Sequence, residues 1–568
     1  MTSGLRQGLT NYGDEGFSLF LRKAFIKGAG YTDEALDRKI VGIIDTGSGF
    51  NPCHGNMPSL IEAVKRGIML QGALPIVFPT ISIHEAFSHP TSMYLRNLMS
   101  MDTEEMLRAQ PMDAVVLIGG CDKTVPAQLM GAISADIPAI QLVVGPMVTG
   151  SHRGVRVGAC TDCRGYWAKY RADVIDLEEI SAVGNELVPG VGTCGVMGTA
   201  STMACITEAM GLMPLGGASA PANGSARLRI AELSGKLAAT KVMRPSSVLQ
   251  KKNFENAITV LQALGGSTNA IVHLLAIAGR VPGLNLTLDD FDRIGKETPM
   301  LTDLKPSGTQ YMEDFNKAGG VPTLLRYLRP RLHMDALTIT GMTLGEALDR
   351  HPSSFSQTLI HPLNQPIFKS GALAVLRGNL APNGCIIKQS SSAPHLLRHR
   401  GKAVVFSGSV DLQKRIDSED LDVDENSVLV LQNIGPRGNP GMPEAGYIPI
   451  PKKLARRGVK DMLRISDGRM SGTAAGAIVL HVSPEASEGG LLAVVQDGDL
   501  IEVDVEKRTI ELVVSRDELN KRSNVWKETV RPEVVKQRAG RGYRKLYETS
   551  VLQAHQGVDF DFLVAEKV

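Results

Sequence analysis

Residues 39–45 (KIVGIID) and 114–118 (AVVLI) are the stretches that decide the fold. Both are continuous apolar runs of strand length, which is typical of strands buried on both faces. Two similar runs lie at 74–78 (LPIVF) and 139–144 (AIQLVV), and a helical pattern occupies 58–72. Strands that alternate with helices predict a mostly parallel α/β sheet, whose ligands bind at the carboxyl ends of the strands.

The pattern changes near residue 365, where short β-rich segments begin. These segments and the turns between them predict a barrel-like sheet, and the Gly- and Pro-rich residues 435–446 predict a long loop. We therefore expect residues 1–365 to form an N-terminal parallel-sheet α/β domain. Residues 366–568 should form a C-terminal β-barrel-like domain with flanking helices. The segments expected as strands are 372–377, 402–406, 427–431, 492–495 and 500–505.

The composition is that of an ordinary globular protein of 568 residues, with 43% hydrophobic and 21% charged residues. Sixty-one Lys and Arg against 59 Asp and Glu give a net charge of +2, which argues against a nucleic-acid or membrane-surface partner. We find no apolar run long enough to span a membrane and no secretion signal in the first residues. The sequence therefore predicts a cytoplasmic protein.

Seven cysteines, an odd number in a large chain, disfavour a disulfide framework and leave thiols for metal binding. Cys53, Cys121 and Cys194 each lie in a loop among small residues, and the first two follow predicted strands. Three thiolates at one edge of the sheet could hold an iron–sulfur cluster with one iron open to a substrate hydroxyl. Buried, inert cysteines are the alternative, because these spacings match no ferredoxin pattern.

Cys160 and Cys163 form a lone C-x-x-C pair. A zinc site would need a second pair, and a redox-active pair would need a compact βαβ unit, which we do not find. We interpret both as structural residues.

Acidic residues near the predicted strand ends could form a site for a hard cation. Asp122 and Lys123 follow Cys121 directly, Glu85 follows the second strand, and Glu444 lies in the long loop. Any one of them alone is equally explained as a surface charge. Residues 464–473 precede an apolar run and are compatible with a helix start that binds an anion or with an ordinary capped helix, and residues 265–269 also precede a helix-like run.

Seven ordered motifs give a more specific indication than any single one. Together they resemble the dihydroxy-acid dehydratase and 6-phosphogluconate dehydratase family, which includes sugar-acid dehydratases. The motifs are NPCHG (51–55), GGCDKTVPAQLMGA (119–132), GTCGVMGTASTMA (192–204), LGGSTNA (264–270), LRGNLAPNG (376–384), GPRGNPGMPE (435–444) and RISDGRMSGTAAG (464–476).

The resemblance implies a role for each matching residue. The cluster ligands would be Cys53, Cys121 and Cys194, and the Mg²⁺ ligands Glu85, Asp122, Glu444 and a carbamate on Lys123. The catalytic residues would be Lys123, Ser471 as an alkoxide base, and Thr473 as a substrate contact. Mg²⁺ would bind the carboxylate and 2-hydroxyl of the substrate, the open iron would take the 3-hydroxyl, and Ser471 would remove the C2 proton. The product would be a 2-keto-3-deoxy acid.

The residues around Glu85 and Ser471 (85–98 and 469–473) resemble the sugar-acid branch, although His84 departs from its pattern. This branch implies a 2Fe-2S rather than a 4Fe-4S cluster, an aldonate substrate, and a homodimer or homotetramer. The first alternative is a dihydroxy-acid dehydratase of branched-chain amino-acid biosynthesis. A non-catalytic iron–sulfur redox sensor and a zinc enzyme built on Cys160 and Cys163 are further alternatives.

Overall fold

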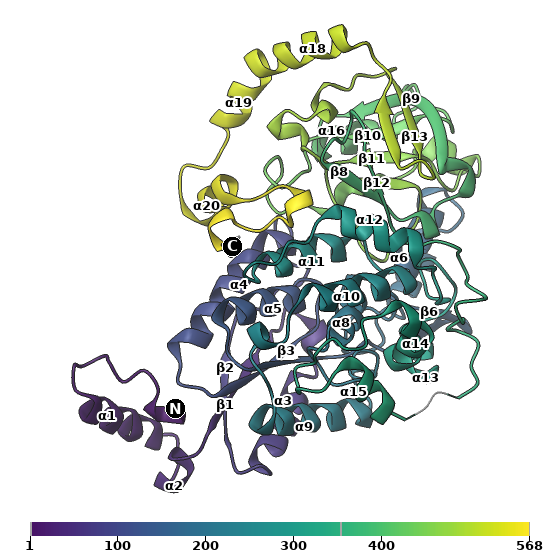
Figure 1. Ribbon diagram of the computed structural model, residues 1–568. Coiled ribbons are helices and arrows are strands. Elements are labelled where there is room, and N and C mark those ends of the chain that lie inside the picture. The colour runs from purple at the N-terminus through teal and green to yellow at the C-terminus, as the bar shows by residue number, and fades with distance from the viewer. Residues whose placement is uncertain (1–2, 353–354, 567–568) are drawn as a thin grey trace.

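The computed structural model describes residues 3–352 and 355–566 (Figure 1). Its N-terminal region contains a four-stranded, fully parallel sheet in the order β2-β1-β3-β4. The strands are β1 (Ile40–Asp45), β2 (Leu74–Pro79), β3 (Ala114–Gly119) and β4 (Ala139–Val143). All four strands expected from the sequence are present, which confirms the predicted α/β class.

Helices cover both faces of this sheet, because alternate side chains of each strand point to opposite sides. Val41 and Ile43 pack toward α3 (Met57–Met69), whereas Ile40 and Ile44 share a second core with side chains of α4 (Ser92–Ala109) and α5 (Thr124–Ala135). Three almost fully buried helices extend the first core: α8 (Thr199–Ala209), α10 (Lys251–Ala263) and α11 (Asn269–Gly279). Helix α9 (Ser225–Thr240) also contributes side chains to this core.

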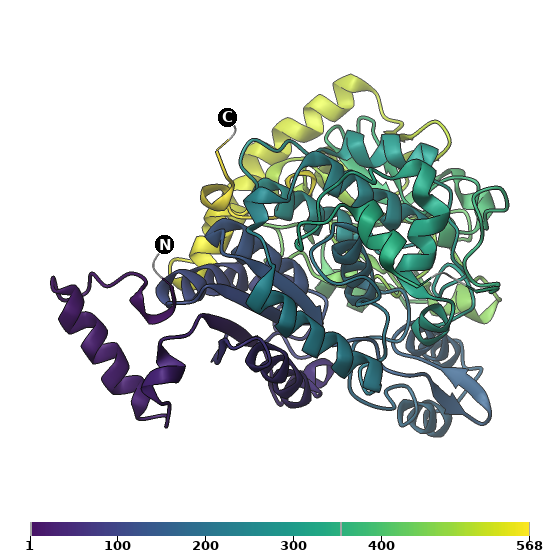
Figure 2. The same cartoon turned by 60° about the horizontal axis from the view of Figure 1, so that its bottom comes forward.

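Smaller elements complete this region. They are α1 (Glu15–Lys27), α2 (Asp33–Leu36), α6 (Thr161–Arg171), α7 (Leu177–Gly184), α12 (Leu288–Glu297), α13 (Met312–Lys317), α14 (Gly320–Leu328), α15 (Leu344–Arg350) and the hairpin β5 (Gly150–His152) and β6 (Val155–Val157). Helices α1 and α2 form an arm that projects from the body (Figure 2). No helix in the described ranges is both long and apolar enough to cross a bilayer.

The C-terminal region contains an eight-stranded sheet in the order β14-β13-β9-β10-β11-β12-β8-β7. The four strands from β9 to β12 are parallel to one another, and the other pairings are antiparallel. Arg377, just after β7, pairs with Thr509 of β14, so the two edge strands meet. The predicted barrel-like architecture is thus confirmed as a nearly closed barrel. Its strands are β7 (Ala374–Leu376), β8 (Gly384–Ile387), β9 (Arg398–Phe406), β10 (Val428–Leu431), β11 (Arg464–Ser466), β12 (Ile478–Ser483), β13 (Leu500–Asp504) and β14 (Thr509–Leu512).

Two local predictions in this region are wrong. Residues 492–495 were expected to form a strand, but the 3₁₀ helix Leu491–Val494 occupies this stretch. The carbonyl groups of Leu492 and Val495 accept hydrogen bonds from the Gln432 amide rather than from a neighbouring strand. The apolar run after residue 473 is compatible with a helix, but it leads from a loop into strand β12. A short buried strand and a buried helix have the same apolar pattern, so the sequence alone did not separate them. The helix expected after residues 265–269 is present as α11.

The end of the chain returns to the N-terminal region through α18 (Arg516–Val525), α19 (Arg531–Lys536) and α20 (Gly542–Ser550), as Figure 1 shows in yellow. Tyr547 and Phe560 pack in one cluster with Met93 of α4. The buried Arg96 guanidinium donates hydrogen bonds to the carbonyl oxygens of Gly557 and Val558, both at 2.9 Å. The two regions are therefore joined by apolar packing and by buried hydrogen bonds.

Candidate active site

Two of the predicted site cysteines meet at the carboxyl edge of the parallel sheet. Cys53 lies in the 3₁₀ helix Pro52–His54 after β1, and Cys121 follows β3. Their sulfur atoms and a ring nitrogen of His84 all lie within 4.8 Å of one another. Such a group of one imidazole and two thiols could hold a metal ion.

His54 joins the two cysteine loops. Its Nε2 accepts the amide N–H of Cys121 at 3.0 Å, so the ring proton lies on Nδ1, which donates to the carbonyl of Thr46 at 2.9 Å. Burial lowers the pKa of His54 to about 4, and the ring is neutral at neutral pH. Hydrogen bonding with Cys121, followed in size by that with His84, lowers the pKa of Cys53 to about 6 against the effect of burial. Cys53 is therefore the thiol of this pair that ionises more readily.

The third predicted ligand, Cys194, lies in the loop before α8 and next to a cysteine that the sequence analysis interpreted as structural. The Sγ atoms of Cys194 and Cys160 are 3.8 Å apart. Hydrogen bonds with Cys163 and Cys194 lower the pKa of Cys160 to about 3. Interpreting Cys160 as merely structural therefore missed a thiol that touches the candidate site.

The predicted oxygen ligands surround the amine of Lys123. Its Nζ lies 3.2 Å from Glu85 Oε2, 3.5 Å from Asp122 Oδ2 and 3.6 Å from Glu444 Oε1. The Lys123 side chain is fully buried, and Nζ makes no hydrogen bond of good geometry within the described residues. Three carboxylates from two regions of the chain thus converge on one buried position.

Neighbouring polar groups fix these carboxylates. Glu85 accepts hydrogen bonds from Thr91 Oγ1 at 2.6 Å and from the Ser92 hydroxyl. Burial disfavours its charge, but the nearby Lys123 and Arg469 cations hold the pKa of Glu85 well below its usual range.

Glu444 comes from the C-terminal region and occupies the more buried position. Its Oε1 accepts from Arg469 Nη1 at 3.2 Å and from Asn269 Nδ2 at 3.4 Å. Burial and the charge of Glu85 raise its pKa. Three acidic groups face two cations, Lys123 and Arg469, and this surplus of acidic groups favours an additional cation.

Ser471 and Thr473 lie in the loop between β11 and β12, with their hydroxyl oxygens 2.8 Å apart. The preceding carbonyl, of Met470, accepts from Asn269 Nδ2 at 3.1 Å, so the amide that contacts Glu444 also holds this loop. A Cβ atom on Gly472 would lie 2.7 Å from the amide nitrogen of Thr199, the first residue of α8. The absence of a side chain at Gly472 therefore allows the Ser471 loop to pack against the segment that carries Cys194.

Comparison with known proteins identifies the family. The family model for the dihydroxy-acid/6-phosphogluconate dehydratase N-terminal region matches residues 38–347, and the corresponding C-terminal model matches residues 358–558. The chain belongs to the dihydroxy-acid/6-phosphogluconate dehydratase family. Members of this family are dehydratases, so the chain is a hydro-lyase, as the sequence motifs predicted.

Individual dehydratases match almost the whole chain. L-arabonate dehydratase of Azospirillum brasilense is 45% identical over 555 residues, which cover 96% of this chain and 95% of that protein. 6-deoxy-6-sulfo-D-gluconate dehydratase of Pseudomonas putida is 43% identical, with 94% and 92% covered. Dihydroxy-acid dehydratase of Pyrococcus abyssi (strain GE5 / Orsay) is 37% identical, with 95% and 97% covered. These sugar-acid dehydratases are thus more similar to the chain than this dihydroxy-acid dehydratase is.

For this dehydratase, reasoning from sequence assigned no role to several residues that the structure places at the site. They are His54, Thr91, Cys160, Asn269 and Arg469. Asn269 and Arg469 lie within two of the quoted motifs, so their position in those motifs was the available signal. Cys160 lies outside all seven motifs, and only its distance from Cys194 shows its position.

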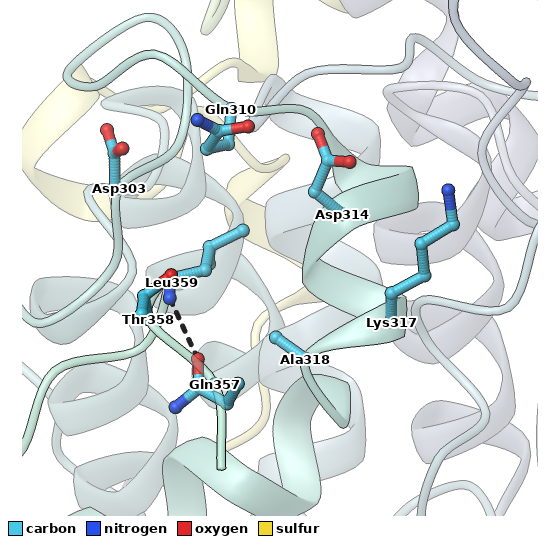
Figure 3. A pocket seen from close by; sticks show the side chains of 8 residues that line it. All are labelled: Asp303, Gln310, Asp314, Lys317, Ala318, Gln357, Thr358 and Leu359. Carbon is cyan, nitrogen blue, oxygen red and sulfur yellow. Dashed lines mark hydrogen bonds between the residues drawn. The ribbon is translucent and has the colours of Figure 1, made fainter.

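A separate surface pocket of about 330 Å³ lies between α13 and residues 357–359 (Figure 3). Its lining includes Asp303, Asp314 and Lys317, and none of the predicted site residues of the dehydratase. Asp314 is already paired with Arg156 at 2.7 Å, and Asp303 accepts hydrogen bonds from Thr309. The acids of this pocket thus stabilise neighbouring segments.

Proposed function

We propose that the chain dehydrates a sugar acid (an aldonate), or a related 2,3-dihydroxy acid, to the 2-keto-3-deoxy acid with an iron–sulfur cluster and Mg²⁺. One observation carries the proposal: residues 121–123 join a buried thiol group directly to a buried group of carboxylates. Cys121 belongs to the first group, and Lys123 lies at the centre of the second. The proposed iron–sulfur site and the proposed Mg²⁺ site are therefore adjacent. A single substrate molecule could then bind both metals at once.

The residues present suit both metal groups. All seven cysteines are free, and Cys53, Cys121 and Cys194 are the proposed cluster ligands. Around Lys123, a buried Nζ without a well-oriented hydrogen bond among the described residues and the surplus of acidic groups suit Mg²⁺ held by the three carboxylates. A carbamate on Nζ would turn this amine into a further oxygen ligand. When bound, the cluster and Mg²⁺ supply Lewis-acid chemistry to the hydroxyl and carboxylate groups of the substrate.

The chain itself supplies the base and its support. Ser471 Oγ takes the proton from C2 of the substrate, the C3–O bond breaks, and the departing hydroxide receives this proton and leaves as water. The resulting enol tautomerises to the 2-keto acid. Thr473 Oγ1, 2.8 Å from Ser471 Oγ, stabilises the ionised serine by donating a hydrogen bond to it. Asn269 aligns this loop with the carboxylates, because its amide contacts both Met470 and Glu444.

A sugar acid is favoured over a branched-chain dihydroxy acid by the relatives, since proteins named as arabonate and sulfogluconate dehydratases share more identity with the chain. Dihydroxy-acid dehydratase activity is the second candidate, because those enzymes also match most of the chain.

The test is an assay of 2-keto acid formation by protein reconstituted anaerobically with iron, sulfide and Mg²⁺. Turnover on a panel of aldonates should exceed turnover on 2,3-dihydroxyisovalerate by at least tenfold. The opposite preference would retain the chemistry and assign the second candidate. A protein that binds neither iron nor sulfide would refute the cofactor proposal.

We also propose that the chain forms a homodimer or homotetramer. Phe20 and Phe25 on the projecting α1 are 64% and 79% exposed, and such aromatic side chains are typical of interfaces (Figure 2). Light scattering on the F20E/F25E double variant should show a smaller species than the wild type. Phe562→Glu, at an exposed aromatic residue outside the arm, is the matched control.

A further inference from the structure

The distance between the sulfur atoms of Cys160 and Cys194 equals that expected for two thiolates bound to one metal ion. With a metal–sulfur bond of about 2.3 Å, two thiolates on one tetrahedral ion lie about 3.8 Å apart. The two Sγ atoms are 3.8 Å apart. We propose that Cys160 is a fourth thiolate ligand of the cluster and shares an iron with Cys194. This inference rests on the proposed cluster.

The four thiols fall into two pairs, which is how a 2Fe-2S cluster with four cysteine ligands is held. Cys53 and Cys121 form one pair, within 4.8 Å of each other, and Cys160 and Cys194 form the second. With three ligands, the iron held by Cys194 would lack a second protein ligand. Cys160 lies at the position where that ligand is needed.

His84 is the competing candidate for the fourth position, and its geometry suits another role. Its nitrogen lies within 4.8 Å of Cys53 and Cys121, the pair that is already complete. Its Nδ1 accepts the amide N–H of Ala86 at 3.2 Å, so the ring proton lies on Nε2. His84 is therefore placed to donate a hydrogen bond to a thiolate rather than to bind iron.

The start of α6 is fixed so that Cys160 also faces the Ser471 loop. The hydroxyl of Thr161, the next residue, donates to the carbonyl of Thr473 at 2.9 Å. Asp162 accepts from the Gly158 amide and the Tyr311 hydroxyl, both at 2.8 Å, and from Lys305 Nζ at 2.7 Å. Cys160 is thus held by neighbours on both sides, between the cluster thiols and the proposed base.

This position gives Cys160 a role in substrate entry. A substrate hydroxyl at the iron of Cys194 would have to replace Cys160, which would leave as a thiolate with its electron pair, so that no oxidation or reduction would be involved. Cys163 hydrogen-bonds with Cys160 and can hold the released thiolate.

The experiment is Mössbauer spectroscopy of wild type and variants reconstituted with ⁵⁷Fe and sulfide, without substrate. The wild type should show two similar iron sites with sulfur ligands only. In Cys160→Ala, half of the iron should move to a new doublet with a larger isomer shift. Cys205→Ser, in the buried part of α8, should keep the wild-type spectrum.

Should Cys160→Ala lose the cluster, Cys160→Ser is the informative variant, because its hydroxyl keeps a ligand there and should give the new doublet. Two unequal iron sites in the wild type, unchanged in Cys160→Ala and Cys160→Ser, would overturn the assignment of Cys160 while leaving the proposed function intact. A wild type without iron and sulfide would refute both proposals.

Discussion

The sulfur side and the oxygen side of the site are built differently. The thiols come from the N-terminal region alone: from the loops after β1 and β3, the loop before α8 and the start of α6. The carboxylates come from both regions, since Glu444 belongs to the C-terminal region and Glu85 and Asp122 to the N-terminal one. The proposed sulfur ligands can therefore be in place before the two regions dock, whereas the proposed oxygen ligands require the finished interface.

Arg469 is the side chain that joins the two regions at this point. It is fully buried, and its Nη1 donates to Glu444 and Asn269 while Nη2 donates to Thr91. Variants that alter only the thiols or only the carboxylates therefore test whether the two halves of the site are built independently.

The largest expected effect is that of Cys121→Ala. Removal of a ligand from the sulfur side should abolish cluster binding and bring turnover below detection, because the soft site then lacks a thiolate. Iron and sulfide analysis and the keto-acid assay measure both effects. Cys385→Ala is the matched control, since Cys385 is buried in β8 of the barrel. A Cys121→Ala protein that retains a full cluster would contradict the ligand assignment.

Ser471→Ala should leave both sides intact and remove the base between them. The expected loss of turnover is about 10²- to 10⁴-fold, as for removal of a general base. Iron, sulfide and magnesium contents should equal those of the wild type. An active Ser471→Ala enzyme would refute the base assignment.

A pH dependence of stability is expected within the region that carries the thiols. Burial raises the pKa of Glu208 in α8 to about 7. Between pH 4.5 and 7 the folded state holds a proton that the unfolded state has lost, so the free energy of unfolding should fall as the pH rises, by up to about 3 kcal/mol. Glu208→Gln should remove this slope in denaturant titrations. An identical slope in the variant would show that another group is responsible.

Asn269→Ala should weaken only the oxygen side. Loss of the amide that positions Glu444 should lower Mg²⁺ affinity by about 10- to 100-fold, with no change in the absorption spectrum of the cluster. Titrations with Mg²⁺, followed by activity and by direct binding, measure the affinity in the wild type and in the variant. A change in the cluster spectrum with unchanged Mg²⁺ affinity would show that Asn269 supports the thiols and not the carboxylates.

The smallest effect is expected for an exposed ion pair between the two regions. Arg456 of α17 (Lys452–Arg456) contacts Asp173 of the N-terminal region at 2.7 Å, and both side chains are about half exposed. Arg456→Gln should lower the free energy of unfolding by less than about 1 kcal/mol, and high salt should remove the difference. A larger loss in thermal denaturation would show that this contact, and not the buried Arg469, holds the regions together.

Local pattern predicted much of this molecule. The four strands of the parallel sheet were predictable because they are buried on both faces and therefore appear as continuous apolar runs. Asp122 and Lys123 adjoin Cys121 in the sequence, so their proximity required no knowledge of the fold.

Contacts between distant residues were not predictable in the same way. The distance between Cys160 and Cys194 depends on how the hairpin β5–β6 and helices α6 and α7 fold between them, and no periodicity encodes it. The apolar run after Ser471 was compatible with a helix until the parallel pairing of β11 with β12 decided it.

The return of the chain end to α4 has a consequence for synthesis. The buried Arg96 donates to the carbonyl of Gly557, 461 residues later in the chain. At roughly 5–20 residues per second, the ribosome needs on the order of 20–90 s to supply that acceptor. Until residues 557 and 558 are synthesised and fold back, the Arg96 guanidinium lacks these two acceptors, and α4 cannot reach its final packing. A chain cut before residue 557 would leave this face of α4 incompletely packed, which gives quality-control proteases a means of recognising it.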